Sequence, residues 1–188
     1  MKTLLKNKSL ETDRILLRNI RKSDLNNFLY YRSNPELAKF QSWEPFNRQQ
    51  ALEYLLKYRN STLGDKGKWA LLGIIHKVDK KLIGDVSLKV DAVENRNGEI
   101  GCTLSKDYHH MGLANEAISI ILDYAFYTLE MHRIIGITDT RNSASIHLML
   151  NLGMKLEAYY SENIWFKGSW CDEYQFAILE KEWLKFKK

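Results

Sequence analysis

The stretch around HHMGLANEA (His109–Ala117) constrains the fold of this chain more than any other part of its sequence. A strand-like run, GEIGCTL (Gly98–Leu104), precedes it, and an apolar periodicity predicts a helix from Leu113 to about Leu129. Such a turn brings backbone N–H groups into the first turn of a helix, where unpaired donors and the positive end of the helix dipole attract an anion. The pattern indicates either an anion site or an ordinary strand-to-helix connection.

The rest of the chain alternates between strand and helix patterns. Three apolar runs joined by short polar turns, WALLGIIHK, KLIGDVSLKV and GEIGCTL, predict an antiparallel meander. The helix after His109 and the buried run HRIIGITD predict a crossover unit. The remaining expected elements are a first strand at 13–19, helices at about 24–33, 47–58 and 143–152, and two long strands joined at FKGSW (Phe166–Trp170). We therefore expect a mixed α/β domain with a central, mostly antiparallel sheet.

The size and composition favour one domain over residues 1–188. With 188 residues, of which 45% are hydrophobic and 27% charged, the chain is long enough for one well-buried core. Cys102 and Cys171 have neither a metal spacing nor a disulfide framework, which fits a reducing cytosol. We see no membrane span and no cleavable leader, so we expect a cytoplasmic protein without a membrane partner.

The net charge of +5 favours anionic partners. Either nucleic acid, including the ribosome, or a polyanionic cofactor would satisfy it. The closing KEWLKFKK carries much of the excess, and we expect it to be a solvated helix end or tail. Because no nucleic-acid-binding signature accompanies the charge, we expect no DNA partner, and charge alone does not indicate RNA binding.

The turn resembles the acyl-CoA pyrophosphate loop of the GNAT acetyltransferases. That loop has Gln or Arg, two residues, Gly, one residue, and then Gly or Ala, and His109, Gly112 and Ala114 occupy these positions. The surrounding EIGCTLSKDYHHMGLANEA and the later NSASIHLMLNLGM are similar to the RimJ/RimL branch, which acetylates ribosomal-protein N-termini. The resemblance covers about residues 10–182. It departs from the family pattern at His109 and at His110, where many relatives carry a second glycine.

The resemblance implies both an architecture and an activity. The sheet would have about seven strands, splayed between the fourth and fifth, with about four flanking helices. The activity would be acetyl-CoA-dependent N-acetylation of a primary amine by direct attack in a ternary complex. The acceptor would be a protein N-terminus, which could bring the enzyme into contact with the ribosome. A small amine such as a polyamine or an aminoglycoside is an equal alternative.

The resemblance also assigns cosubstrate contacts. Beside the side chain of His109, the backbone cradle would comprise His110, Met111, Gly112, Leu113, Ala114 and Asn115. The strand edge at Cys102, Thr103 and Leu104 would pair with the amides of pantetheine as an extra strand. We interpret Cys102 as a small core residue rather than a nucleophile, because no histidine is matched to it.

Glu99, Asn142 and Ser145 are the candidates for chemistry. Partial burial in an apolar strand would raise the pKa of Glu99 and suit it as a general base, directly or through water; alternatively it is a solvated rim residue. Asn142 and Ser145 match the RimJ/RimL pattern, in which they bind the pantetheine region and protonate the CoA sulfur. Alternatively, Asn142 is a helix cap. The tyrosine acid of other branches is replaced by Met149, which cannot donate a proton.

Several alternatives stay open. The aromatic residues Phe40, Trp43 and Phe46 are typical of packing plugs, whereas the architecture that the resemblance implies would place them beside the acceptor site. The carboxylates of the last hairpin, Asp172 and Glu173, either attract a cationic amine or keep an edge soluble. A non-catalytic acyl-CoA-binding module and a ribosome-docking protein are the competing functions. We expect no metal site, and the chain would be a monomer or a homodimer.

Overall fold

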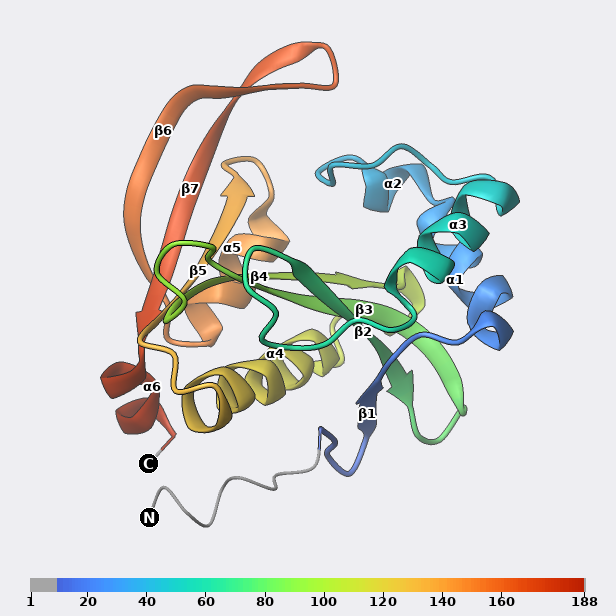
Figure 1. Cartoon of the computed structure of the whole chain (residues 1–188). Coiled ribbons are helices and arrows are strands. Elements are labelled where there is room, and N and C mark those ends of the chain that lie inside the picture. The colour runs from blue at the N-terminus through green and yellow to red at the C-terminus, as the bar shows by residue number, and fades with distance from the viewer. Residues whose placement is uncertain (1–9, 188) are drawn as a thin grey trace.

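A computed structural model describes residues 10–187 as one seven-stranded sheet with helices on both faces (Figure 1). The strand order is β1-β2-β3-β4-β5-β7-β6, and each neighbouring pair is antiparallel except β4 with β5. The strands are β1 (Ile15–Arg18), β2 (Trp69–His76), β3 (Lys81–Val90), β4 (Asn97–Leu104), β5 (Arg133–Asp139), β6 (Lys155–Phe166) and β7 (Ser169–Leu179). The predicted fold class is confirmed.

The first four strands form the expected meander because their connections are tight. The turn between β3 and β4 is held by Asp91, whose carboxylate accepts hydrogen bonds from the N–H groups of Val93 (2.8 Å) and Glu94 (2.9 Å). The two strands then pair in unbroken register from Val90 opposite Gly98 to Gly84 opposite Leu104.

The sheet divides between β4 and β5, as the resemblance implies. The two strands share three parallel pairs, Asn97 with Arg133, Gly98 with Ile134 and Glu99 with Ile135. Beyond these pairs β4 continues to Leu104 and β5 to Asp139 without pairing to each other. We call this opening the β4–β5 split.

Six α-helices are present among the described residues, rather than about four. They are α1 (Leu25–Arg32), α2 (Pro35–Ala38), α3 (Arg48–Tyr58), α4 (Leu113–Asp123), α5 (Ser143–Asn151) and α6 (Glu180–Phe186). The short α2 is separate because Pro35 starts a new helix and the Asn34 side chain accepts a hydrogen bond from the N–H of Glu36 (2.9 Å). Within residues 10–187, none of the helices is long and apolar enough to cross a membrane.

The helices cover the two faces of the sheet with separate apolar clusters. On one face, Ile100 and Leu104 of β4 pack with α4, including Leu113 and Ile121. On the other face, α1 and α3 pack against β2 through a second cluster that includes Phe28, Leu55, Leu71 and Ile75. Because successive strand side chains alternate between faces, β4 presents its odd-numbered side chains to the α1–α3 face.

The C-terminal helix α6 is docked, which corrects the expectation of a solvated end or tail. Trp183 has 0% exposure, and its indole N–H donates to Asp123 of α4 (2.9 Å). Lys187 pairs with the same carboxylate at 2.8 Å. The many lysines of KEWLKFKK predicted a solvated segment, but the segment also contains Trp183. The free energy gained by burying so large a side chain outweighs the solvation of the neighbouring charged residues.

Candidate active site

The hydrogen bonds between β3 and β4 decide which backbone groups face the β4–β5 split. The N–H of Asp91 donates to the carbonyl of Asn97 (2.9 Å), and the N–H of Ser105 donates to the carbonyl of Ile83 (2.7 Å). In an antiparallel pair such bonded residues alternate, so the odd-numbered residues of β4 point their N–H and C=O groups at β3. Those of Cys102 and Leu104 and the carbonyl of Ile100 therefore point into the split, whereas the N–H of Ile100 faces the carbonyl of Ile135 in the last β4–β5 pair.

This alternation shows which of the three residues expected to pair with pantetheine direct their backbone groups into the split. Cys102 directs its backbone into the split, whereas Thr103 lies opposite Asp85 and bonds toward β3. The carbonyl of Leu104 is already in contact with Nε2 of His109, at 2.9 Å. The edge that remains for an added strand thus consists of the carbonyl of Ile100 and both backbone groups of Cys102. Ile100 was missed because its apolar side chain gives no sign of where its backbone points.

The turn that leads into α4 is built from left-handed residues. His110 has φ 61° and Gly112 has φ 76°. At His110 a residue with a side chain is strained, and glycine would adopt the same conformation without strain. The bulkier His110 does not prevent the turn from forming.

Contacts from distant parts of the chain brace the same turn. Arg14 donates to the carbonyl of Met111 (2.9 Å) and pairs with Glu116 in the first turn of α4 (2.6 Å). The hydroxyl of Tyr108 donates to Asp79 in the β2–β3 turn (2.6 Å). The local sequence gave no sign of Arg14, because its partners lie about a hundred positions along the chain.

Within residues 10–187, no side chain caps the first backbone N–H groups of α4, which are available to an anion. The helix N-cap is Gly112, which has no side chain that could cap the first turn. The backbone N–H groups of Leu113, Ala114 and Asn115 lie in that first turn, at the positive end of the helix dipole. Such an arrangement suits a pyrophosphate.

Glu99 occupies the last β4–β5 pair before the sheet divides. Its side chain is half-buried on the α1–α3 face, opposite to that of Ile100. Burial raises the pKa of Glu99, the neighbouring ammonium of Lys89 lowers it, and the carboxylate of Glu173 raises it further. A carboxyl with a raised pKa at the mouth of the split has the placement and the chemistry of a general base.

Asn142 and Ser145 lie at the start of α5, which follows β5. The side-chain oxygen of Asn142 accepts a hydrogen bond from the N–H of Ser145 (3.2 Å), so Asn142 is the helix cap that its residue type suggests. Its amide N–H₂ is not needed for that bond. The hydroxyl of Ser145 is half-buried and makes no hydrogen bond within residues 10–187. Met149 is buried against Gly136 beneath β5.

Cys102 behaves as a packing residue. It packs against the apolar cluster beneath α4. Burial and the charge of Asp85 raise the pKa of its thiol, so that the thiolate is strongly disfavoured. This agrees with its interpretation as a small core residue rather than a nucleophile.

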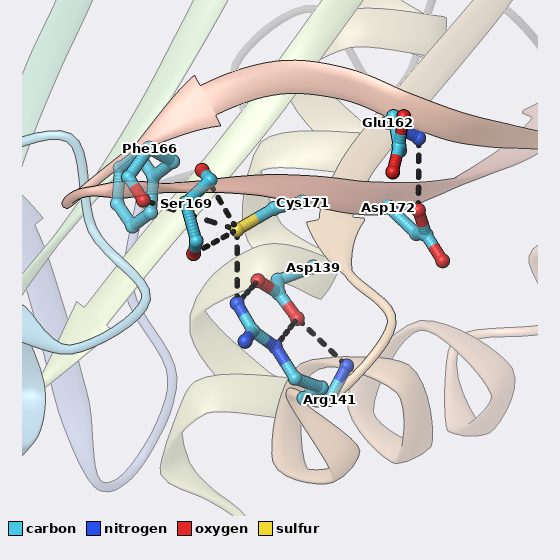
Figure 2. Close-up of polar contacts among 7 residues, drawn as sticks. All are labelled: Asp139, Arg141, Glu162, Phe166, Ser169, Cys171 and Asp172. Atoms are coloured by element: carbon cyan, nitrogen blue, oxygen red, sulfur yellow. Dashed lines mark hydrogen bonds and ion pairs between the residues drawn. The ribbon is translucent and has the colours of Figure 1, made fainter.

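The hairpin carboxylates have structural partners. Asp172 accepts a hydrogen bond from the N–H of Glu162 (2.8 Å), as Figure 2 shows, and another from the hydroxyl of Tyr159 (2.7 Å). These bonds hold the irregular part of β6, where Glu162 has φ 46°. Glu173 accepts a hydrogen bond from the side-chain amide of Asn163 (2.5 Å).

The aromatic segment divides into two roles. The Trp43 ring lies 4.6 Å from the guanidinium of Arg32, and Phe46 lies 5.9 Å from it, so both cover a buried charge. Arg32 in turn pairs with Asp85 of β3 at 2.7 Å. Phe40 instead lines a cavity beside the β6–β7 hairpin. Trp43 and Phe46 are therefore packing residues, and Phe40 is available to a ligand.

Two cavities lie near these elements. A cavity of about 800 Å³ runs beside α4, and its wall carries the carboxylates of Glu11, Asp13, Glu116 and Asp123. The same wall carries Arg14 and Lys187 and reaches the start of α4 at Gly112 and Asn115, so only that end of the cavity suits a phosphate. Among the described residues, no group of histidine, cysteine and carboxylate side chains could hold a metal ion.

The acetyltransferase (GNAT) domain model matches residues 14–155, which is most of the chain. The chain belongs to the GNAT acetyltransferase family. The chain is 29% identical to the uncharacterized N-acetyltransferase p20 of Bacillus licheniformis, over 93% of this chain and 98% of p20. GNAT enzymes use acetyl-CoA and an amine acceptor, so the activity is N-acetyl transfer.

Solved GNAT structures share the fold. A GNAT acetyltransferase from Bacillus anthracis superposes with a TM-score of 0.83 at 26% identity, over 92% of this chain and 98% of the other. Spermidine N-acetyltransferase from Vibrio cholerae, in complex with CoA and spermine, superposes with a TM-score of 0.76 at 22% identity, over 92% and 99%.

Proposed function

We propose that this GNAT enzyme transfers the acetyl group of acetyl-CoA to a primary amine, which attacks the thioester carbonyl directly. One observation carries the proposal. Glu99, with a raised pKa, lies at the point where β4 and β5 part, and the anion-binding start of α4 follows the end of β4. The proposed base and the backbone groups proposed to hold acetyl-CoA therefore lie at the same opening in the sheet.

The chain's own groups account for holding acetyl-CoA. The N–H groups at the start of α4 bind the pyrophosphate, and the backbone of Ile100 and Cys102 binds the pantetheine arm. Arg14 and Tyr108 keep the turn in place through their bonds to Met111 and Asp79.

Two residues handle the protons. Glu99 accepts the proton that the amine loses as its nitrogen forms the new C–N bond, directly or through one water. Ser145 gives its hydroxyl proton to the sulfur as the C–S bond breaks, and regains a proton from solvent. Asn142 orients the arm through its amide N–H₂, since its oxygen is held by the helix.

The acceptor we propose first is a protein N-terminus, ribosomal proteins included, because the block at Asn142 and Ser145 is similar to the RimJ/RimL branch. A polyamine is the second candidate. A relative from Vibrio cholerae, 24% identical over 90% of this chain, is a spermidine N(1)-acetyltransferase. Both acceptors present a primary amine at the end of a chain.

Thiol release from acetyl-CoA tests the proposal. The acceptors are ribosomal-protein N-terminal peptides, spermidine and kanamycin, and the variant is Ser145→Ala. Ser143→Ala is the matched control, because Ser143 is exposed in the same helical turn. We expect at least one acceptor to turn over, Ser145→Ala to slow it by about a hundredfold, and the control to match the wild type.

The same assay separates the competing functions. If CoA raises the melting temperature but no amine is acetylated, the chain is an acyl-CoA-binding module. If CoA has no effect and RNA binding is strong and salt-dependent, the ribosome-docking function replaces the proposal. An equal rate for Ser145→Ala and the wild type would remove the acid role of Ser145.

A further inference from the structure

His76, the last residue of β2, is connected to Tyr108, which precedes the turn into α4. Nδ1 of His76 lies 2.8 Å from an oxygen of Asp79 in the β2–β3 turn, and the Tyr108 hydroxyl donates to the same oxygen at 2.6 Å. Because an ionised carboxylate only accepts hydrogen bonds, Nδ1 of His76 carries the proton of the first bond. One carboxylate oxygen thus joins His76 to Tyr108, and we call this arrangement the Asp79 bridge.

The bridge fixes both the position and the protonation of Tyr108. The ring of His76 meets the ring of Tyr108 edge-on, with centroids 5.3 Å apart, and Tyr108 also packs against the apolar cluster beneath α4. The bonds from Tyr108 and His76 hold the pKa of Asp79 below its usual range. The bond to the Asp79 carboxylate raises the pKa of Tyr108 to about 12. Near neutral pH the carboxylate is therefore ionised, the phenol is protonated, and both groups can keep their bonds.

The end of β2 also reaches the other end of the turn before α4. The N–H of Lys77 donates to the carbonyl of Arg14 (2.9 Å), and the Arg14 guanidinium donates to the carbonyl of Met111 (2.9 Å). Met111 lies three residues after Tyr108. Two consecutive residues, His76 and Lys77, are therefore connected to both ends of the turn.

The turn depends on such support because its backbone conformation is strained. His110 has φ 61° and is followed two residues later by Gly112 with φ 76°. A residue with a side chain keeps a left-handed conformation only where the surrounding structure imposes it. The shape of the turn decides where the first N–H groups of α4 point, and a site that is rigid before binding loses less entropy when its ligand binds.

The bridge lies at the opposite end of the meander from the proposed base. His76 is paired with Lys81, the first residue of β3, whereas Glu99 is paired with Lys89 near the last residue of β3. A change at the bridge should therefore alter the cosubstrate site without altering the surroundings of Glu99.

We propose that His76 and Asp79 are positioning residues for acetyl-CoA. They fix Tyr108, and through it the turn whose following N–H groups bind the pyrophosphate. The inference rests on the cosubstrate site proposed above and adds two residues that act on it from the β2–β3 turn. Because they act through Tyr108, their loss should weaken acetyl-CoA binding and leave the transfer step unchanged.

The test measures the Kd for CoA by calorimetry, together with kcat, the KM for acetyl-CoA and the melting temperature. Asp79→Ala removes the bridge, Tyr108→Phe removes one of its bonds, and His76→Phe removes the other bond while keeping a ring. His76→Asn is the conservative variant, because its side-chain amide can donate from a position close to that of Nδ1. Val78→Ala is the matched control, since Val78 lies in the same turn and is 79% exposed.

We expect Asp79→Ala to raise the Kd for CoA and the KM for acetyl-CoA about tenfold, and Tyr108→Phe and His76→Phe to raise them about three- to fivefold. The kcat and the KM for the amine should keep their wild-type values. His76→Asn and Val78→Ala should bind CoA as the wild type does. Adding His76→Phe to Asp79→Ala should cause no further loss, because His76 acts through Asp79.

The inference is overturned if Asp79→Ala binds CoA as tightly as the wild type, or if His76→Phe weakens binding equally with and without Asp79. It is also overturned if kcat and the melting temperature fall along with the affinity, because the bridge would then only stabilise the fold. Where Asp79→Ala does not fold, Tyr108→Phe decides in its place, since it removes a single oxygen atom.

Failure of the proposed function gives different results. A wild type that does not bind CoA overturns the cosubstrate site and this inference with it. A wild type that binds CoA but acetylates no amine overturns the proposed transfer alone, and the Kd values for CoA still decide whether His76 and Asp79 position the turn.

Discussion

Glu173 on β7 raises the pKa of Glu99 on β4, although β5 lies between the two strands. The effect crosses the sheet on the face that α1 and α3 cover. Burial of the Glu99 carboxyl raises its pKa more than Glu173 does, and Lys89 opposes both. The base proposed for the reaction is therefore tuned by a residue of the hairpin.

The pH dependence of kcat/KM reports this tuning. A base must be deprotonated to act, so activity is lost as the pH falls through the pKa of Glu99. Glu173→Gln removes the nearby negative charge, and we expect the acidic limb of the profile to move to lower pH. Glu99→Gln should abolish that limb and lower the rate. Glu162→Gln, an exposed hairpin carboxylate, serves as the control, and an unmoved limb in Glu173→Gln would contradict the coupling.

Stability should change with the opposite sign. The pKa of Glu99 is higher in the folded protein than in the unfolded chain, so the folded protein binds more protons between the two values. Its contribution to stability therefore falls as the pH rises through that window. We expect Glu99→Gln to melt at the same temperature as the wild type or higher at pH 7, measured by calorimetry. A clear loss would mean that the Glu99 carboxylate makes a structural bond.

The two left-handed residues before α4 should respond differently to substitution. His110→Gly relieves the strain of φ 61°, and we expect it to keep CoA binding with a stability gain of up to about 1 kcal/mol. Gly112→Ala should weaken the CoA-induced rise in melting temperature. An added Cβ would meet Arg14 at an ordinary 3.6 Å, so the cost lies in the backbone conformation at φ 76°. Equal CoA shifts for both variants would contradict this assignment.

Removing one partner of the buried Arg32–Asp85 pair should lower the stability of the protein strongly, whereas replacing both partners by apolar residues should lower it much less. The two residues are 2% and 3% exposed, and among the described residues Nε of Arg32 has no hydrogen-bond partner. Asp85→Ala should destabilise the protein by about 3–5 kcal/mol in urea unfolding, because a buried guanidinium loses its partner. The double variant Arg32→Met, Asp85→Leu should recover much of that loss. A mild effect of Asp85→Ala would indicate that solvent reaches Arg32.

Because α6 is docked on α4, substitutions at its buried and exposed residues should change the stability by very different amounts. Trp183→Ala should cost about 3–5 kcal/mol of unfolding free energy, because a large cavity opens and Asp123 loses a donor. Lys185→Ala, an exposed residue of the same helix, should change the stability by less than about 0.5 kcal/mol. Similar values for the two would mean that α6 is not packed on α4.

The sequence predicted the elements better than the contacts between them. Apolar runs joined by short polar turns placed the meander, and the helix after Gly112 was expected from its periodicity. The extra helices were missed because α2 has one turn between Pro35 and Ala38, and α6 depends on a single buried side chain, Trp183. Patterns of that length carry no periodicity.

The candidate site follows the same division. Glu99, Asn142 and Ser145 were named from their residue types and from the family resemblance, which depend on positions close in the chain. Arg14 and Lys167 act on partners about a hundred or more residues away, so no local pattern could reveal them. Tertiary packing decides that Lys167 bonds to the carbonyls of Ala38 and Trp43.

Because β4 and β5 stop pairing early, the middle of the sheet has unpaired backbone groups of the kind found on an edge strand. The carbonyl of Ile100 and the N–H of Cys102 point into the split, between two strands that have stopped pairing. The amide hydrogen of Cys102 should therefore exchange with deuterated solvent as quickly as that of an outer strand, while the flanking amides that bond to β3 stay protected. Unpaired strand edges normally lie at the outside of a sheet, where proteins protect them from pairing with other chains. Here the unpaired edge of β4 lies at the centre of the sheet, where a bound substrate would supply the missing hydrogen-bond partners.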